Sequence, residues 1–218
     1  MQTMTRIEHP TDRQDELKAS KGRVRLLRIP PHRFVMIDGT GPPVPESFGT
    51  RMPGLYGTAY GLRFMLKGRG IDGRVGPLEG LWWTTDGSRD LDAIFAAKET
   101  DTWRWTLMIT LPPEATDDEV ETQLAIARTR LHPTLAPSLR TEVFEEGTVA
   151  QLMHVGPYNE ERPTIELLHA QIQATGFRPT GCHHELYLGD PRRAAPERLR
   201  TIIRQPVVDI EGLRSSLG

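Results

Sequence analysis

One order of predicted elements occurs twice along this chain, and this repetition constrains the fold more than any single motif. In the first half, a long helix is followed by a strand with Leu81-Trp82-Trp83 and a turn at Asp86. In the second half, a long helix is followed by a strand with Leu186-Tyr187-Leu188 and a turn at Asp190. A strand precedes each helix, and a short helical segment with a closing strand completes each half. The repetition indicates a duplicated unit, with an unrelated α+β arrangement as the alternative.

The elements of the first half are predicted from hydrophobic periodicity and from the positions of Gly and Pro. One helix begins near Ser47 or Pro53 and ends at Lys67, because its apolar residues recur at helical spacing. The other elements are the strands Val24–Ile29, Phe34–Ile37, Leu78–Thr85 and Trp103–Leu111 and the short helix Leu91–Ala97.

Between the halves, the capping box Thr116-Asp117-Asp118-Glu119 predicts a helix that runs to about Arg130. A strand pair, Glu142–Glu145 with Thr148–Val155, is predicted to turn at Gly147. The later elements are the helix Glu160–Thr175 with Asn159 as its N-cap, and the strands His183–Leu188 and Thr201–Val207.

These elements place one domain at residues 23–208, made of two pseudo-repeats at about 23–112 and 140–208. Residues 1–22 carry many charges and little apolar periodicity, which predicts a flexible or weakly helical lead-in. Residues 209–218 form a C-terminal tail. A chain of 218 residues is long enough for one large domain or for two small halves that share a core.

The composition excludes several classes of protein. Lys+Arg (27) and Asp+Glu (29) nearly cancel to a net charge of −2, so we expect no broad basic surface and no direct nucleic-acid partner. Neither a run of about eighteen apolar residues nor a signal peptide is present, which predicts no membrane partner and a cytoplasmic location. The one cysteine, Cys182, excludes an intramolecular disulfide and a multi-cysteine zinc site. His183 and His184 face opposite ways in a strand, and no P-loop or dinucleotide fingerprint occurs, so we expect no metal site and no cofactor.

Several segments carry a resemblance to a known family. His154-Val155-Gly156-Pro157-Tyr158 is similar to the strand-end motif of the GyrI-like small-molecule-binding domains. The segment from His183 to Arg193 is similar to their penultimate strand and turn, and Pro196–Val207 continues the match. With Pro77–Trp83, these segments resemble the stand-alone branch of the family, which lacks a DNA-binding domain, over about residues 23–208.

The resemblance implies two strand–helix–strand–strand modules of the SHS2 type, with an antiparallel sheet, helices on one face and a ligand groove on the other. The groove takes planar, hydrophobic or cationic small molecules. Some stand-alone members hydrolyse cyclopropane-bearing DNA-alkylating antibiotics by means of a Glu in the strand that matches His183–Leu188. The resemblance therefore implies a cyclopropanoid hydrolase, monomeric or homodimeric, that serves drug detoxification or resistance. The alternatives are a non-catalytic drug binder and a regulator of a protein partner such as gyrase.

Side chains alternate between the two faces of a strand, and this groups the candidate residues around Glu185. His183, Glu185 and Tyr187 share one face and are expected to face the groove. Leu186 and Leu188 share the other face and are expected in the core beneath the helices. The resemblance implies catalysis by Glu185 with help from aromatic groove residues, for which Tyr187 is the candidate in this strand. His183, on the same face, is a candidate for ligand binding as a proton donor.

Alignment of the two halves makes the expected site asymmetric. Trp82 falls opposite Tyr187, so two aromatic rings would wall one site. Gly80 falls opposite Glu185, so only one half supplies a carboxylate. One ligand, rather than two related by symmetry, is expected in such a site.

Glu185 has two possible functions beside aromatic rings. In poorly solvated surroundings it can act as a general acid, or as a general base towards water. If it stays ionised, it can hold a cation together with the rings. The alternative without function is a solvated strand residue paired with an Arg.

The remaining candidates are aromatic. Tyr56 and Tyr60 are one helical turn apart and either line the rim of the groove or pack in the core. Trp103 and Trp105 share one strand face; at least one is expected in the core, and Trp103 is the ligand-binding candidate. Trp83 points away from the groove and is expected in the core.

Overall fold

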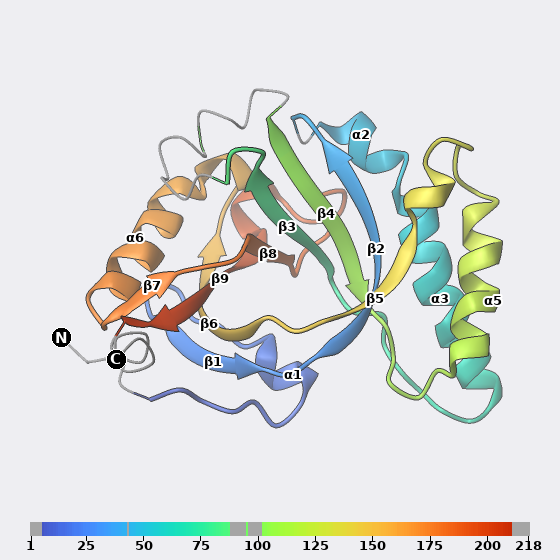
Figure 1. The fold of residues 1–218 in the computed structure, drawn as a ribbon, viewed down its shortest axis with the longest axis horizontal. Coiled ribbons are helices and arrows are strands. Elements are labelled where there is room, and N and C mark those ends of the chain that lie inside the picture. The colour runs from blue at the N-terminus through green and yellow to red at the C-terminus, as the bar shows by residue number, and fades with distance from the viewer. Residues whose placement is uncertain (1–5, 43, 88–94, 96–101, 211–218) are drawn as a thin grey trace. The chain divides into compact units, whose positions relative to one another are not determined.

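The computed structural model describes residues 6–42, 44–87, 95 and 102–210, which divide into two compact units (Figure 1). Unit 1 contains Met1–Pro30 and Glu145–Gly218, and unit 2 contains Pro31–Phe144. Apart from Phe95, the predicted helix Leu91–Ala97 lies outside the described residues. The strands of each unit pair in antiparallel fashion and pack with helices, which confirms the predicted α+β class with an antiparallel sheet.

Unit 2 has the strand order β3-β4-β2-β5. Residues that pair across two strands share a face of the sheet. Val35 and Ile37 of β2 pair with Ile109 and Leu107 of β4, and all four are 0% exposed. Phe48 of α2 packs against Trp105, which lies on this face, and α3 contacts β2 and β4. The bounds are β2 (His32–Thr40), β3 (Leu78–Thr84), β4 (Trp103–Thr110), β5 (Arg140–Phe144), α2 (Pro45–Gly49) and α3 (Met52–Gly68), with a 3₁₀ turn at Ala136–Ser138.

Helix α3 lies between the sheet and helix α5 (Asp117–Arg128) (Figure 1). Its glycines, which lower helix propensity, allow this close packing. A Cβ added at Gly61 would meet the Gln123 side chain of α5, and one at Gly54 would lie 2.8 Å from a methyl group of Leu131. The predicted capping box of α5 is present. The stripe that α3 buries towards the core consists of Leu55, Ala59, Leu62 and Leu66.

Unit 1 has the strand order β1-β6-β9-β8, and the short strand β7 also pairs with β9. Helix α6 (Arg162–Gln173) covers one face and buries Ile165, Leu168 and Ile172. The strand bounds are β1 (Arg25–Ile29), β6 (Gly147–Val155), β7 (Phe177–Pro179), β8 (His183–Tyr187) and β9 (Arg200–Asp209), with 3₁₀ turns at Tyr158–Glu160 and Pro196–Arg198.

The described part of the lead-in packs against the other face of unit 1. Its helical turn α1 (Arg13–Glu16) is capped by Asp12, whose side chain accepts from the Asp15 amide. Leu17 and Ala19 pack on a buried cluster of Met153, Leu186 and Ile202. This segment is therefore part of the packed structure of unit 1.

The predicted strand pair around Gly147 is wrong. Strand β5 pairs with β2 of unit 2, whereas β6 pairs with β1 and β9 of unit 1. A two-residue hairpin of the I′ type needs positive φ at both central residues. Glu145 and Glu146 occupy those positions, and no non-glycine residue in the described ranges has positive φ. The chain therefore does not reverse there but continues into the other unit.

The predicted N-cap at Asn159 is also wrong. Helix α6 begins at Arg162 after Glu161, and Asn159 lies in the preceding 3₁₀ turn. Pro163 explains the shift, because proline has no N–H and is tolerated in the first turn of a helix, where that group has no helical partner.

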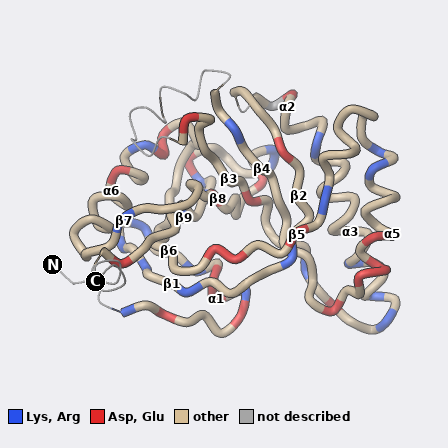
Figure 2. The backbone as a smooth tube through the Cα atoms, viewed as in Figure 1, with Lys and Arg blue, Asp and Glu red and all other residues tan. Residues whose placement is uncertain are grey.

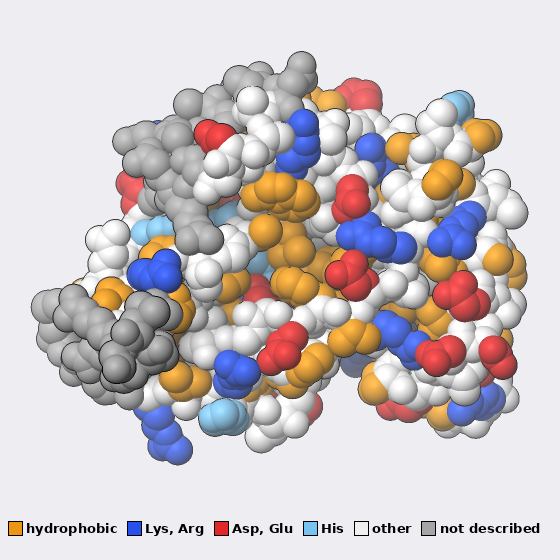
Figure 3. All heavy atoms as spheres, viewed as in Figure 1, with side chains coloured by type: hydrophobic (Ala, Val, Ile, Leu, Met, Phe, Trp, Pro, Cys, Tyr) orange, Lys and Arg blue, Asp and Glu red, His pale blue; other side chains and the backbone are white. Residues whose placement is uncertain are grey.

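Charges of both signs are interspersed along the described residues (Figure 2). On the face shown in Figure 3, acidic and basic side chains lie side by side over part of unit 2. In unit 2, Arg140 of β5 forms ion pairs with Asp38 at 2.9 Å and with Glu142 at 3.1 Å. None of the helices in the described ranges is both long enough and apolar enough to span a bilayer.

Candidate ligand-binding and catalytic site

Strand β8 holds three of the predicted site residues in mutual contact. Tyr187 Oη donates to Glu185 Oε2 at 2.7 Å, and His183 Nε2 lies 3.2 Å from Glu185 Oε1. These side chains are half-buried, whereas His184 and Leu186 are buried on the other face. The alternation expected along this strand is observed, and it places Glu185 between two hydrogen-bond partners, with His183 as a donor in its Nε2–H tautomer.

The face that carries Glu185 is the face that α6 covers, which corrects the prediction that it lies opposite the helices. Tyr187 pairs in register with Thr201 of β9, and Thr201 pairs with His154 of β6. His154 Nδ1 lies 2.9 Å from Thr164 Oγ1 in α6. Because cross-strand partners share a face, Glu185 and Tyr187 lie on the α6 side of the sheet.

The reason for this difference is the element that covers the opposite face. Leu186 is 0% exposed, as expected, but Leu17 and Ala19 of the N-terminal segment cover it instead of a helix. Periodicity identifies which face of a strand is buried. It does not identify which element buries that face.

Tyr158 lies next to Tyr187 at the end of the Gly156-Pro157 strand motif. The two rings meet edge to face, with their centroids 5.4 Å apart. Burial, and then the charge of Glu185, raise the pKa of the Tyr187 hydroxyl well above its usual value near 10. The hydroxyl therefore stays protonated at neutral pH and can donate to Glu185.

His169 of α6 is a polar residue near this group that sequence analysis missed. It is 9% exposed, and its Nε2 has no hydrogen-bond partner in the described part of the chain. Burial, and then the charge of His183, lower the pKa of His169 to about 4, so the ring is neutral at pH 7. Its position one helical turn after Ile165, on the buried stripe of α6, is the signal that the sequence offers.

Each oxygen of the Glu185 carboxylate has two lone pairs and can accept more than one hydrogen bond. A water molecule or a ligand donor can therefore bind Glu185 while Tyr187 and His183 hold its orientation. A carboxylate fixed in this way can accept a proton from water or face a cationic group.

Unit 2 contains an aromatic cluster, which we define as Phe48, Trp82, Trp103 and Trp105. Ring centroids are 5.8 Å apart for Trp82 and Trp103, 5.9 Å for Trp82 and Phe48, and 4.9 Å for Phe48 and Trp105. Trp82 is buried on the face that α2 covers, with 5% exposed. Trp83, expected in the core, is only half-buried on the opposite face. Phe48 was not predicted, because it lies in a Pro-rich segment without periodicity.

The indole N–H groups of the cluster differ in their partners. Trp105 Nε1 donates to Gly41 O at 3.2 Å. Trp82 Nε1 and Trp103 Nε1 are buried and have no partner among the described residues. A buried donor without an acceptor costs about 1–3 kcal/mol. The Cζ atom of Arg51 lies 4.8 Å from the centroid of the Trp105 ring, so the protein's own guanidinium already covers a face of that ring.

Tyr56 and Tyr60 stack along α3 together with Phe64. The ring centroids of Tyr56 and Tyr60 are 6.0 Å apart, and those of Tyr60 and Phe64 are 6.4 Å apart. Tyr60 is 43% exposed and Phe64 is 63% exposed. The burial of Tyr60 in the core is thereby excluded. Contact of either tyrosine with a ligand stays a prediction.

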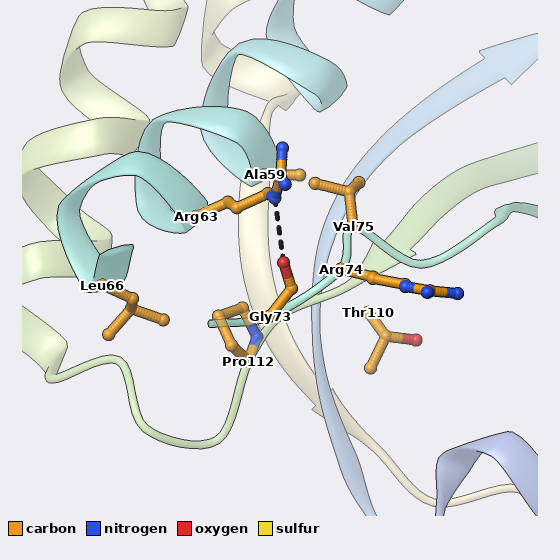
Figure 4. Close-up of a pocket in the computed structure, with 8 residues that line it drawn as sticks. All are labelled: Ala59, Arg63, Leu66, Gly73, Arg74, Val75, Thr110 and Pro112. Carbon is orange, nitrogen blue, oxygen red and sulfur yellow. Dashed lines mark hydrogen bonds between the residues drawn. The ribbon is translucent and has the colours of Figure 1, made fainter. Parts of the chain in front are cut away.

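A shallow pocket elsewhere in unit 2 contains none of the predicted site residues (Figure 4). Its space of about 20 Å³ suits a single water molecule. Arg63 Nε donates across it to Gly73 O at 2.8 Å. The lining residues are Ala59, Arg63, Leu66, Gly73, Arg74, Val75, Thr110 and Pro112.

A buried ion network, also missed from the sequence, supports β8 from its other face. Glu146 accepts from Arg204 Nη1 at 2.9 Å and lies 2.8 Å from His184 Nδ1, and all three side chains are at most 3% exposed. Arg204 Nε also donates to Gln151 Oε1. Burial opposes the charged form, but His184 and Arg204 together lower the pKa of Glu146 to about 2. From the sequence, only a turn at Gly147 was predicted in this segment, and the burial of Glu146 was not.

Two expectations stay predictions. The pairing of Trp82 with Tyr187 joins residues of different units, and the functional roles of the site residues rest on chemistry rather than on a bound ligand. Within the described ranges, no group of three or more His, Cys, Asp or Glu is arranged to hold a metal ion.

Comparison with known proteins identifies the family. The model of the GyrI-like small molecule binding domain matches residues 23–208. A conserved, uncharacterized protein from Listeria innocua is 34% identical, with a TM-score of 0.76 over 93% of this chain and 100% of its own. A hydrolase from Listeria innocua is 32% identical, with a TM-score of 0.73 over 90% of this chain and 96% of its own.

More distant similarity concerns the fold alone. The C-terminal domain of EcmrR is 14% identical, with a TM-score of 0.52 over 86% of this chain and 98% of its own. A comparison with curated proteins gives no match. The family model covers most of the chain, and two solved structures align over nearly its whole length at more than 30% identity. This chain belongs to the GyrI-like small-molecule-binding domain family.

Proposed function

We propose that this chain is a hydrolase that opens the cyclopropane ring of planar DNA-alkylating drugs, with Glu185 as the base that activates water. The observation that carries the proposal is the fixed carboxylate of Glu185, which accepts from Tyr187 at 2.7 Å and contacts His183 at 3.2 Å. The similar hydrolase from Listeria innocua supports hydrolysis as the reaction type. Such an activity would serve detoxification or drug resistance.

The reaction adds one water molecule to the drug. Glu185 takes a proton from water while the water oxygen forms a bond to the less hindered cyclopropane carbon. The opposing carbon–carbon bond breaks, and its electron pair moves through the conjugated system onto the carbonyl oxygen. Protonation of that oxygen completes the balance, and the proton held by Glu185 returns to solvent. General-base assistance of this kind contributes about 10²–10⁴-fold to a rate.

The protein groups around Glu185 suit this role. Tyr187 stays protonated because burial and Glu185 raise its pKa, so it holds one carboxylate oxygen without competing for the proton. His183 holds the other oxygen. Fixed orientation of a base lowers the entropic cost of reaching the transition state.

The test is incubation of the whole chain with a cyclopropane-bearing alkylator whose ring is conjugated to a carbonyl. Mass spectrometry should find a product heavier by one water molecule, in more than one equivalent per protein. The same drug without protein measures the uncatalysed reaction. Recovery of intact drug despite tight binding would contradict hydrolysis.

That second outcome would identify a binder of hydrophobic or cationic drugs that does not turn them over. The aromatic cluster favours this alternative, because buried tryptophans bind planar molecules without any chemical step. The two functions differ only in whether the ligand is released altered.

A further inference from the structure

Two buried side chains of unit 1 bind main-chain carbonyl groups of the N-terminal segment. Arg204 Nη2 donates to Glu16 O at 3.3 Å. Gln151 Nε2 donates to Glu16 O at 2.8 Å and to Lys18 O at 3.1 Å. Both donor residues are 0% exposed. Every peptide segment carries such carbonyl groups, so these donors recognise the course of a backbone and not a particular side chain.

The segment that supplies these carbonyls, residues 13–20, is called the strap below. Besides its hydrogen bonds, it has an apolar contact with the sheet, in which Leu17 and Ala19 pack on the buried cluster that contains Leu186 of β8. The strap thus lies on this face of unit 1 as a bound peptide would, with main-chain hydrogen bonds and two apolar side chains that fit the surface.

The contacts of the strap suit a segment that can lift while unit 1 stays folded. Its helix, α1, has only four residues, and a helix of this length has little stability of its own. When the strap lifts, water can replace its carbonyl groups as acceptors. The charge of Arg204 stays compensated, because Glu146 of unit 1 accepts from Arg204 Nη1 at 2.9 Å. Lifting therefore leaves no buried charge without its counter-charge, which would be the costliest consequence of such an opening.

The surface that the strap covers is the opposite side of the candidate site. Leu186 and His184 of β8 point to the side of the strap, and His183, Glu185 and Tyr187 point to the side of α6. Since these residues share one short strand, a shift of β8 that follows loss of the strap moves both sets. The hydrogen bond of 2.7 Å that holds Glu185 weakens steeply when its geometry changes.

We infer that this face of unit 1 is a peptide-docking surface, that its occupant is the strap of the same chain, and that docking of the strap sets the position of β8. With the strap docked, β8 is packed on both faces and Glu185 has the geometry described above. With the strap lifted, unit 1 stays folded and the orientation of Glu185 relaxes. The strap is thus a positioning element for the candidate site.

Docking of the strap and its coupling to β8 require no reaction, and only the expected effect on turnover rests on the proposed function. Docking and coupling can both be measured by NMR on the whole chain in the absence of a drug. A chain without hydrolytic activity whose strap behaves as expected would contradict the hydrolase alone. An active chain whose strap never lifts would contradict the docking surface alone.

Hydrogen exchange of the unaltered, ¹⁵N-labelled chain measures whether the strap lifts on its own. The amide of Met153 in β6 donates to Ser20 O at 3.1 Å, so its exchange reports opening of the strap. Successive amides of an antiparallel strand point to opposite sides, so the amide of Leu152 points to β9 and reports opening of the sheet. After correction for intrinsic rates, we expect Met153 to exchange about 100-fold faster than Leu152. Equal rates would mean that the strap opens only when unit 1 unfolds, and would overturn the inference.

A variant of the strap tests the coupling to β8. Leu17→Asp should displace the strap, because it places a charge against the apolar cluster behind β8. Gln14→Asp is the matched control, since it adds the same charge at an exposed position of the same segment. The ring signals of His183 and Tyr187 should shift in Leu17→Asp and keep their positions in Gln14→Asp. Faster exchange of Met153 in Leu17→Asp with unchanged ring signals would contradict the coupling.

A synthetic peptide with the sequence of residues 6–22 tests the occupant. Added to the Leu17→Asp chain, it should bind saturably and return the ring signals of His183 and Tyr187 towards their original positions. The same peptide with Leu17→Asp should do neither. In hydrolysis of an alkylator, the Leu17→Asp chain should lose about tenfold in kcat with KM within about twofold, and the unaltered peptide should restore the rate. Absence of binding by the unaltered peptide, or binding without recovery of the ring signals, would overturn the inference.

Discussion

Strands β8 and β3 occupy matching places in the two predicted repeats, yet their side chains have opposite character. On β8, Glu185 contacts Tyr187 and His183, so polar atoms are paired with one another. On β3, Trp82 packs with other rings, and its N–H has no hydrogen-bond partner among the described residues. A repeated order of elements thus does not imply repeated chemistry. One strand carries a fixed acid–base group, and the other carries ring surface.

The rear faces of the two strands differ as well. Behind β8, His184 belongs to a buried network with Glu146 and Arg204. Behind β3, Glu79 is 0% exposed and accepts from Thr110 Oγ1 at 2.9 Å. Ionic support of β8 makes its position sensitive to the loss of one charge. The stability of the aromatic cluster depends instead on how closely its rings pack. The following predictions test this contrast.

The largest effect is expected from Glu146→Gln, which removes the negative charge of the network behind β8 and keeps the shape of the side chain. Arg204, 1% exposed in its side chain, would be left as an uncompensated buried charge, which costs about 3–5 kcal/mol. Chemical denaturation at pH 7 measures the loss. Glu145→Gln is the matched control, because Glu145 pairs with Arg28 at the surface and such pairs contribute about 0–1 kcal/mol. Equal losses in the two variants would remove the contrast between the strands.

The loss of stability caused by Glu146→Gln should depend on pH. The pKa of Glu146 is about 2 in the folded chain and near 4.5 when unfolded. Its contribution to stability is therefore present above pH 4.5 and is lost as the pH falls from 4.5 through 2. The difference in stability between the unaltered chain and Glu146→Gln should narrow over that window.

Next in size is the effect of Glu185→Gln on hydrolysis of a cyclopropane-bearing alkylator. We expect kcat to fall by about 100-fold or more, because the amide cannot take the proton of water. Tyr187→Phe should cost about tenfold, since it removes the 2.7 Å hydrogen bond that orients one oxygen of the carboxylate. Glu166→Gln, on the exposed side of α6, should leave the rate unchanged. Rates for Glu185→Gln equal to those of the control would assign β8 no role in catalysis.

The sequence predicted the contents of β8 well, because alternation in a strand is a local property. The shared face of His183, Glu185 and Tyr187 follows from spacing alone, and so does the burial of Leu186. The element that covers each face could not be predicted. It depends on the N-terminal segment, whose Leu17 and Ala19 show no periodicity.

The features that could not be predicted are those that depend on contacts between residues far apart in the sequence. Glu146 contacts His184 and Arg204, which are 38 and 58 residues later, so its burial has no local signal. Phe48 and Trp82 meet through packing of α2 on β3. Capping at Thr116, in contrast, involves residues three apart and was predicted correctly.

A smaller effect is expected on the aromatic side, from Gly39→Ala. A Cβ at Gly39 would collide with the ring of Trp105, which is fully buried and cannot move freely. Overpacking of this kind costs about 1–3 kcal/mol. Gly73→Ala is the control, because a Cβ there meets nothing within 4 Å. If Gly39→Ala is as stable as Gly73→Ala in chemical denaturation, the cluster is loosely packed and the shape argument for β3 fails.

The smallest effect concerns His169, the residue of α6 whose charge state responds to His183. Burial lowers its folded pKa to about 4, below an unfolded value near 6.5. The unfolded chain therefore binds a proton between pH 6.5 and 4 that the folded chain does not, so stability falls as the pH drops through this window. After allowance for solvent screening, the loss is about 1–2 kcal/mol.

His169→Leu should abolish that fall while the hydrophobic stripe of α6 is kept. Denaturation at pH 7 and pH 4.5 measures the difference, with the exposed His132→Leu as the control that retains it. A pH response equal in both variants would mean that His169 takes up its proton without loss of packing. The environment of β8 would then be more hydrated than its paired polar atoms indicate, and its contrast with the buried aromatic cluster would narrow.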